Sequence, residues 1–345
     1  MSRKQPIYEI GPFKSSTRNT DTQLNLYVSN KRFKIDLFTS SFKSSPALLT
    51  EYLRHVQRQE PEWIPDESEV EVDGEFEDPL DEMHDWVLQP FLPIFHEIAP
   101  LDPSQKYTLE DCLFAEEWHY TVQVVGDGLV PVYLSNTKNI RNHLIGASLP
   151  SSVDYSAFPI YHPREVEVPI SAESAALPGI PRKIFIHGQP QPSFFKIVYR
   201  GDMSITAREI LTYSKIHMAV FDLPILTSQL EGLIQDDDGY VMGLALSYIN
   251  CGGATLNCID GHDPNFSELR QKWVDQISQT LTQFHSHNII WGDAKSANVL
   301  IDVNENAYLI DFGGGYTEGW VEKEKSNSTE GDLQGLENIQ RYLFE

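Results

Sequence analysis

Two groups of polar residues in the last fifth of the chain constrain its fold more than any other feature. Asp293, Lys295 and Asn298 follow residues 269–285, where apolar residues recur on one face of a predicted long helix. Residues 311–313, Asp-Phe-Gly, follow a short apolar run that predicts a strand. An aspartate or asparagine alone is often only a cap or a turn. Placed jointly after a helix and a strand, these residues favour a catalytic loop.

At these positions the sequence resembles the protein-kinase superfamily. Asp293, Lys295 and Asn298 match the catalytic loop D-x-K-x-x-N, and Asp311-Phe312-Gly313 matches the metal-binding triplet of that superfamily. The resemblance implies a phosphotransferase that uses ATP and Mg²⁺. In such a site Asp293 accepts the proton of the attacking hydroxyl, and Lys295 reaches the transferred phosphoryl group. Asn298 and Asp311 supply the oxygen ligands that magnesium prefers.

Two charged residues upstream fit the same chemistry. Lys196 interrupts the apolar run Phe194-Phe195-Lys196-Ile197-Val198, which resembles the V-A-I-K strand of the superfamily. A lysine on such a strand needs an anionic partner, because an unpaired buried ammonium is unfavourable. Glu209 lies thirteen residues further on, in a predicted helix, and fits that ion pair. The alternatives are a solvent-facing lysine on an edge strand and an ordinary surface glutamate.

The adenine of ATP is expected at the connection between the two lobes. An apolar run at residues 240–249 is short enough for a buried strand, and it continues into Asn250 and a Gly-Gly pair. By resemblance, this turn presents main-chain groups to adenine, with Tyr248 and Asn250 as the candidate binding residues. The two glycines suit a flexible connection, although a plain turn explains them equally well.

We therefore expect an α+β chain with a two-lobed protein-kinase-like fold, in which a small antiparallel sheet precedes a mainly helical, shortened large lobe. The predicted parts are an α+β extension of unknown role (1–155), the small lobe (156–250) and the large lobe (251–345). Within the lobes, strands are predicted at 165–170, 183–187, 194–199 and 240–249, and helices at 204–218, 269–285 and from 332 to 344.

The extension alternates short strand-like and helix-like patterns. Hairpins are predicted for 23–28 with 32–38 and for 118–125 with 129–134, and helices for 48–56 and from Pro79 to a kink or end at Pro93. Residues 60–85 are acidic, with no lysine or arginine, which predicts an exposed loop or a short hairpin at Asp73-Gly74. Asp332 is predicted to be a helix N-cap, a buried support of the catalytic loop, or both.

Several features depart from the protein-kinase pattern. Gly292 replaces the arginine before the catalytic aspartate, so control by a phosphorylated loop is not expected. No G-x-G-x-x-G precedes Lys196, and the only glycine in residues 171–181 is Gly179. No A-P-E follows the triplet, and the given sequence stops at Glu345, so a peptide-docking platform is not expected. The stretches 270–273, 289–302 and 309–320 resemble those of uncharacterised fungal protein-kinase-like proteins. That likeness covers roughly residues 160–345 and identifies no substrate.

Composition excludes some classes of partner. A formal net charge of -24 argues against nucleic acid and anionic membrane, because phosphates attract basic surfaces. No apolar run is long enough to span a bilayer, and the N-terminus lacks a signal-peptide pattern. Three scattered cysteines make neither a disulfide framework nor a zinc site. A cytoplasmic or nuclear protein that is not secreted is the expectation.

Two functions remain open from the sequence. The first is an active kinase that phosphorylates a hydroxyl of a small molecule or of a protein Ser or Thr. The second is a pseudokinase or ATP-binding scaffold, motivated by the missing glycine loop and by Trp291-Gly292 in the catalytic loop. Residues 1–155 are expected either to cover the substrate or to brace the lobes.

Overall fold

The computed structural model describes residues 7–59, 78–137, 144–260 and 263–345. The chain divides into two units, residues 1–142 with 169–181 and residues 143–168 with 182–345. Both units contain strands and helices, so the chain is α+β, as the sequence predicts. The boundary predicted at 155 differs from this division, because Ile145 and Ala147 already form β-bridges to Tyr199 and Val241 of the second unit.

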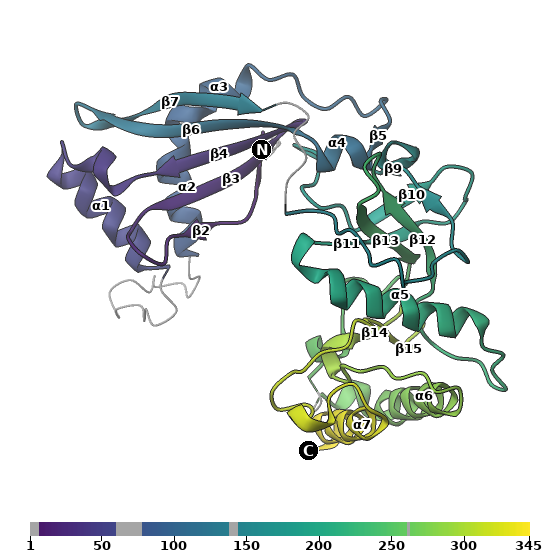
Figure 1. Cartoon of the computed structure of the whole chain (residues 1–345). Coiled ribbons are helices and arrows are strands. Elements are labelled where there is room, and N and C mark those ends of the chain that lie inside the picture. Colours follow the sequence, from purple (N-terminus) through teal and green to yellow (C-terminus); the bar gives the residue numbers. More distant parts are fainter. Residues whose placement is uncertain (1–6, 60–77, 138–143, 261–262) are drawn as a thin grey trace. The chain divides into compact units, whose positions relative to one another are not determined.

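The first unit is built on a mixed sheet with the strand order β1-β3-β4-β6-β7 and with β2 beside β3 (Figure 1). Alternate residues of β3 and β4 are buried on one face, as the period of two in their sequences requires. β4 and β6 are parallel, whereas the other pairs are antiparallel. The strands are β1 Glu9–Ile10, β2 Lys14–Ser15, β3 Thr22–Val28, β4 Lys31–Leu37, β6 Glu116–Val125 and β7 Gly128–Thr137.

Helices add their apolar residues to the core on this buried face. Tyr52, Met83 and Phe95 belong to the same core cluster as the buried residues of β3 and β4. The helices of the unit are α1 Pro46–Gln57, α2 Pro79–Leu88, α3 Leu92–His96 and α4 Leu109–Leu113, the last following the short strand β5 Tyr107–Thr108. The two predicted hairpins and the helix predicted at 48–56 are confirmed. The hairpin considered at residues 73–74 lies outside the described residues.

The helix that begins at Pro79 ends earlier than predicted. It stops at Leu88, and Pro93 lies at the start of the separate helix α3 rather than at a kink. The break is explained by Pro90, which has no N–H for the carbonyl four residues back and whose ring clashes with that carbonyl. Pro93 is tolerated because the first turn of a helix has no intrahelical acceptor for its N–H groups.

Segment 169–181 packs within the first unit. The N–H of Ser29 donates to the carbonyl of Ala175 at 3.0 Å, and the N–H of Leu177 donates to the carbonyl of Ser29 at 2.8 Å. A Cβ added to Gly179 would collide with the hydroxyl and ring of Tyr27, so glycine is needed there for packing. The one glycine of this segment therefore serves the first unit and not a phosphate-binding loop.

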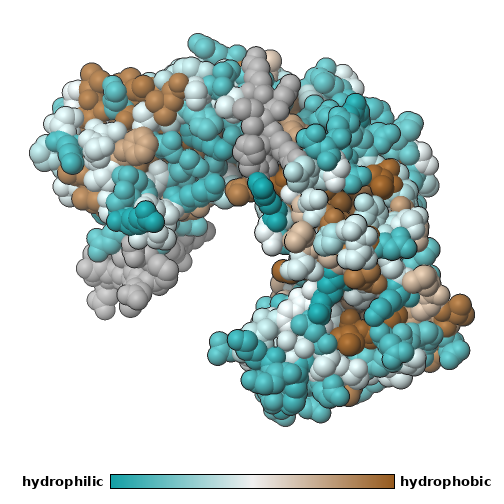
Figure 2. Space-filling model, viewed as in Figure 1, coloured by the Kyte–Doolittle hydropathy of each residue, from teal (hydrophilic) through white to brown (hydrophobic). Residues whose placement is uncertain are grey.

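Hydrophobic side chains remain exposed at the end of the β6–β7 hairpin. Val125, Val130 and Tyr133 are among the most exposed large hydrophobic residues of the first unit. Figure 2 shows hydrophobic residues gathered over this hairpin on the face in view.

The second unit begins with a sheet whose strands follow the order β9-β10-β11-β13-β12-β8. All neighbouring strands are antiparallel except β12 and β8. Helix α5 connects β11 to β12 across this sheet (Figure 1). The elements are β8 Ile160–Tyr161, β9 Val166–Val168, β10 Lys183–Ile186, β11 Ser193–Ile197, α5 Met203–Met218, β12 Leu230–Gln235 and β13 Val241–Ser247.

Strand β12 was not predicted. Its sequence, Leu-Glu-Gly-Leu-Ile-Gln, contains a glycine, and glycine weakens the sequence signal of a strand. Gly232 is required because a Cβ there would lie 2.9 Å from the carbonyl oxygen of Pro159. Leu233 and Ile234 are both fully buried, so the strand is covered on both faces and shows no alternation.

Helices and a small hairpin complete the second unit. They are α6 Ser267–Ser286, β14 Val299–Ile301, β15 Ala307–Leu309 and α7 Thr329–Phe344. The apolar face of α6 buries Trp273, Ile277 and Phe284 in one cluster with Leu343 of α7, and this confirms the pattern read from the sequence.

None of the helices in the described parts of the chain is both long and apolar enough to cross a membrane.

Candidate active site

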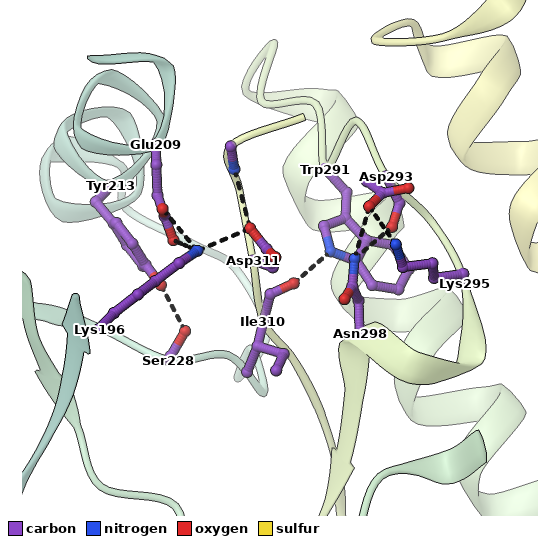
Figure 3. A network of polar contacts seen from close by, with 11 residues as sticks. Lys196, Glu209, Tyr213, Ser228, Trp291, Asp293, Lys295, Asn298, Ile310 and Asp311 are labelled. Atoms are coloured by element: carbon purple, nitrogen blue, oxygen red, sulfur yellow. Dashed lines mark hydrogen bonds and ion pairs between the residues drawn. The ribbon is translucent and has the colours of Figure 1, made fainter. Parts of the chain in front are cut away.

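Lys196 lies at the centre of an ion-pair cluster in the second unit (Figure 3). From β11, its Nζ donates to both carboxylate oxygens of Glu209 on α5 at 2.8 Å and to Oδ1 of Asp311 at 2.9 Å. The ion pair that the sequence predicts between Lys196 and Glu209 is therefore present. The contact between Asp311 and Lys196 was not predicted from the sequence.

Burial and charge set the protonation of this cluster. Burial raises the pKa of Glu209, which is 2% exposed, while the Lys196 ammonium opposes that effect. Burial alone lowers the pKa of Lys196, but the carboxylates of Glu209 and Asp311 outweigh it, so that this pKa is raised. Lys196 therefore keeps a fixed positive charge at neutral pH.

Asp311 and Asn298 present two free oxygens. The N–H of Ile310 donates to the carbonyl of Asn298 at 3.0 Å, so the residue before Asp311 is held beside the catalytic-loop candidate. Asp311 itself has a φ of 63°, a strained value for a residue other than glycine. Within the described residues, Oδ2 of Asp311 and Oδ1 of Asn298 accept no hydrogen bond.

These two oxygens fit magnesium but do not complete a site. No group of three or more His, Cys, Asp or Glu in the described ranges is arranged to hold a metal. Magnesium is commonly held by one or two protein oxygens together with phosphate oxygens and water. Asn298 and Asp311 therefore suit a magnesium ion that arrives with a nucleotide.

Asp293 lies in the loop before β14, and three other residues hold its carboxylate in place by hydrogen bonds. Its Oδ2 accepts hydrogen bonds from Lys295 Nζ at 2.7 Å and from Asn298 Nδ2 at 3.1 Å. Its Oδ1 accepts a hydrogen bond of 3.0 Å from Oγ1 of Thr317, which in turn accepts one of 2.9 Å from Lys295. Thr317 was missed in the sequence, because a single threonine beyond the triplet carries no motif of its own.

Asp332 supports this loop from the start of α7. Its carboxylate accepts hydrogen bonds of 2.8 Å from the N–H groups of both Trp291 and Gly292, and it contacts His285 Nε2 at 3.0 Å. The N-cap of α7 is Ser328 and not Asp332. Of the two roles considered for Asp332, the buried support of the loop is the one that the structure contains.

Trp291 joins the loop to the Asp311 segment. Its indole N–H donates to the carbonyl of Ile310 at 2.8 Å, and its side chain is fully buried (Figure 3). Phe312 is also fully buried, and its ring lies 5.1 Å from that of Tyr213 on α5. A tryptophan at this position therefore ties Asp293 and Asp311 to a common core.

The candidate adenine-binding residues lie after β13. The carbonyl of Asn250 accepts a hydrogen bond of 2.9 Å from Val303 N–H, so it already holds the β14–β15 hairpin. The Tyr248 ring lies 5.1 Å from Lys183 Nζ and is about one-third exposed at 38%. Ile249, between them, makes no main-chain hydrogen bond to another described residue, and its N–H and carbonyl are the groups available to a base.

Phe194 lies on the sheet face that carries Lys196. Side chains alternate along a strand, so residues 194 and 196 of β11 point to one side and Phe195, which is buried, points to the other. Phe194 is paired with Leu246 near the end of β13. An aromatic ring thus stands between Lys196 and the adenine-binding candidates, and Phe194 was not among the residues predicted from the sequence.

The chain matches no protein-family model and no curated protein. The functional assignment therefore depends on the geometry of this site.

Proposed function

We propose that the second unit is a two-lobed protein-kinase-like fold. Several features support this proposal. A helix between β11 and β12 carries the acidic partner of a strand lysine, and β13 continues into the linker. A long helix, a polar loop, a two-stranded hairpin and the Asp-Phe-Gly triplet then follow in that order. The resemblance seen in the sequence and the positions of these elements point to the same fold.

Within this fold, the function that we propose is ATP- and Mg²⁺-dependent transfer of the γ-phosphoryl group to a hydroxyl. The hydroxyl oxygen attacks the γ-phosphorus, the bond to the β,γ-bridging oxygen breaks, and ADP leaves. Asp293 receives the proton of the hydroxyl, while Lys295 stabilises charge on the transferred group. Lys196 binds the phosphates of ATP. Asn298 and Asp311 would hold a magnesium ion, which would supply positive charge to the phosphate oxygens.

One observation carries this proposal. The Lys196–Glu209–Asp311 cluster and the Asp293–Lys295–Asn298 cluster are tied to one another through Ile310, whose N–H and carbonyl bind Asn298 and Trp291. A phosphoryl-transfer site needs positioned charges more than covalent chemistry, and this arrangement supplies them. The acceptor is the hydroxyl of a small molecule or of a protein Ser or Thr.

A thermal-shift and turnover experiment on the full chain tests the function. Millimolar ATP with Mg²⁺ should raise Tm, because a ligand that binds only the folded state stabilises it by RT ln(1 + [L]/Kd). Asp293→Asn should keep this shift and lose ATP turnover by about 10²–10⁴-fold. Asp311→Asn should lose the Mg²⁺-dependent part of the shift, whereas Asp275→Asn, on the exposed side of α6, should change neither. Absence of any shift, or wild-type turnover by Asp293→Asn, would make the proposal wrong.

A second candidate is a pseudokinase or ATP-binding scaffold. Segment 169–181 favours it, because this connection between β9 and β10 would cover the phosphates in a kinase and instead packs within the first unit. Phe194 favours it as well, since a ring on the Lys196 face reduces the room for a base. In that case nucleotide would either fail to shift Tm or shift it without any turnover in the wild-type chain.

A further inference from the structure

Helix α5 makes a side-chain contact to the segment between the triplet and α7. Nη1 of Arg208, the residue directly before Glu209, donates a hydrogen bond to Oδ1 of Asn327. Successive residues of a helix differ by about 100° in direction, so Arg208 and Glu209 point to different neighbours. One helix turn therefore carries both the Lys196 partner and a link to Asn327.

The backbone around the Arg208–Asn327 contact leaves space for these two side chains. Gly314 has a φ of +71°, and a Cβ there would lie 2.7 Å from Nη1 of Arg208. Gly292 has a φ of +90°, and a Cβ there would lie 3.1 Å from Oδ1 of Asn327. Asn327 has a φ of 59°, a left-handed conformation that asparagine adopts more readily than most residues. Three unusual backbone positions thus surround one hydrogen bond.

The glycine before Asp293 gains an explanation from this packing. In the sequence, Gly292 indicates only that no side chain at this position can bind a phosphorylated loop. In the structure, Gly292 leaves the space next to Asn327 that a longer side chain would fill. The link from α5 to the segment uses a neutral amide as its acceptor, so it requires no phosphate.

We infer that Arg208 is a positioning residue: through Asn327 it holds α5 against the segment that follows the triplet, and so keeps Glu209 paired with Lys196. A role for this coupling in phosphoryl transfer rests on the proposed function. The physical coupling itself does not require turnover. A hydrogen bond from a charged donor is stronger than a neutral one, which suits a contact that must hold a helix in register.

Lys215 provides a matched control on the same helix. It is also a cation, and its Nζ approaches a main-chain carbonyl, that of Asn288, at 3.4 Å. It lies two turns from Arg208 and contacts neither Asn327 nor the two glycines. Lys215→Ala therefore shows the effect of removing a positive charge from α5 without removing the contact to Asn327.

The test measures the Lys196 pair directly in the full chain. A protonated, paired amine reacts slowly with an acylating reagent, so the acylation rate of Lys196, followed by peptide mass spectrometry, reports its pairing with Glu209 and Asp311. Arg208→Ala and Asn327→Ala should each raise this rate about tenfold, and the double variant should raise it no further. Asn327→Asp keeps an acceptor and should retain the wild-type rate, as should Lys215→Ala.

Hydrogen exchange of α5 gives a second readout. The amides of residues 203–212 should exchange about tenfold faster in Arg208→Ala than in the wild type, with the β6–β7 hairpin of the first unit unchanged. Unchanged Lys196 acylation in Arg208→Ala, or additive effects in the double variant, would overturn the inference. Neither readout needs ATP turnover, so a chain without phosphotransferase activity could still support it, and an active chain could still refute it.

Discussion

Oδ1 of Asp332 accepts a hydrogen bond of 2.8 Å from the N–H of Gly292, the residue directly before Asp293. Oδ2 of the same carboxylate accepts a second bond of 2.8 Å from Trp291 N–H. Asp332 is 1% exposed, so these donors have no access to water as a replacement partner. The position of the catalytic-loop candidate is thus set by a residue that follows it by some forty positions.

Asp332→Ala should destabilise the second unit strongly. Two buried N–H groups would lose their acceptor, and each unsatisfied group is unfavourable by about 1–3 kcal/mol. We expect the free energy of unfolding to fall by about 3 kcal/mol, measured by chemical denaturation of the full chain. Asp332→Asn keeps one acceptor and should reduce the free energy of unfolding less. Asp275→Ala, on the exposed side of α6, should leave it almost unchanged. Equal stability of Asp332→Ala and Asp275→Ala would contradict this account of the loop.

Removal of Lys196 should be more harmful alone than together with Glu209. Lys196→Met leaves a carboxyl that is 2% exposed without its cation, and breaking a buried pair in this way destabilises proteins by about 3–5 kcal/mol. Lys196→Met/Glu209→Gln removes the unpaired charge and should recover part of that loss. Denaturation of the two single variants and the double variant gives the coupling. If the two losses simply add, the ion pair contributes nothing to stability.

The C-terminal site was the part of the structure most accessible from the sequence. The spacing of Asp293, Lys295 and Asn298 predicts a loop whose groups converge, and these three side chains are hydrogen-bonded together. Lys196 and Glu209 could also be paired in advance, because a lysine on an apolar strand needs an anion nearby. These predictions worked because each depends on a short stretch of chain with strong local periodicity.

Other features depend on contacts that sequence patterns do not contain. Thr317 contacts Asp293 across twenty-four residues, and Arg208 contacts Asn327 across more than a hundred. For residues 171–181 the sequence indicated only the absence of a glycine-rich loop, because nothing in their composition indicates that Ser29 binds this segment. Long-range hydrogen bonds between common polar residues leave no periodic trace, and they decide which unit a segment belongs to.

Thr317 should act on turnover rather than on nucleotide binding. Its hydroxyl contacts both Asp293 and Lys295, so Thr317→Val, which keeps the shape and removes the hydroxyl, takes one hydrogen bond from each side chain. We expect the turnover of a phosphotransferase to fall about tenfold, which is less than the loss of about 10²–10⁴-fold for an acid–base group itself, because Thr317 acts only through Asp293 and Lys295; KM for ATP should be nearly unchanged. Thr317→Ser retains the hydroxyl and should restore most of the rate. A rise in KM with constant kcat would instead assign Thr317 to ATP binding.

The first unit should lose stability at mildly acidic pH through its buried histidines. Burial and the nearby Arg54 lower the pKa of His55 to about 4, and burial also lowers the pKa of His84. A histidine whose folded pKa is depressed contributes stability that is complete above its unfolded pKa of 6.5 and is lost as the pH falls towards 4. At about 1.4 kcal/mol per pKa unit, His55 accounts for roughly 3 kcal/mol over this range.

His55→Phe isolates this effect from the many carboxylates that titrate in the same range. The ring of residue 55 lies 5.3 Å from that of Trp86, so phenylalanine keeps an aromatic contact without a titrating group. The free energy of unfolding, measured between pH 7 and pH 4, should fall less steeply in His55→Phe than in the wild type, with the two curves diverging below pH 6.5. Curves that stay parallel would show that the pKa of His55 is the same in the folded and the unfolded chain, so that burial does not lower it.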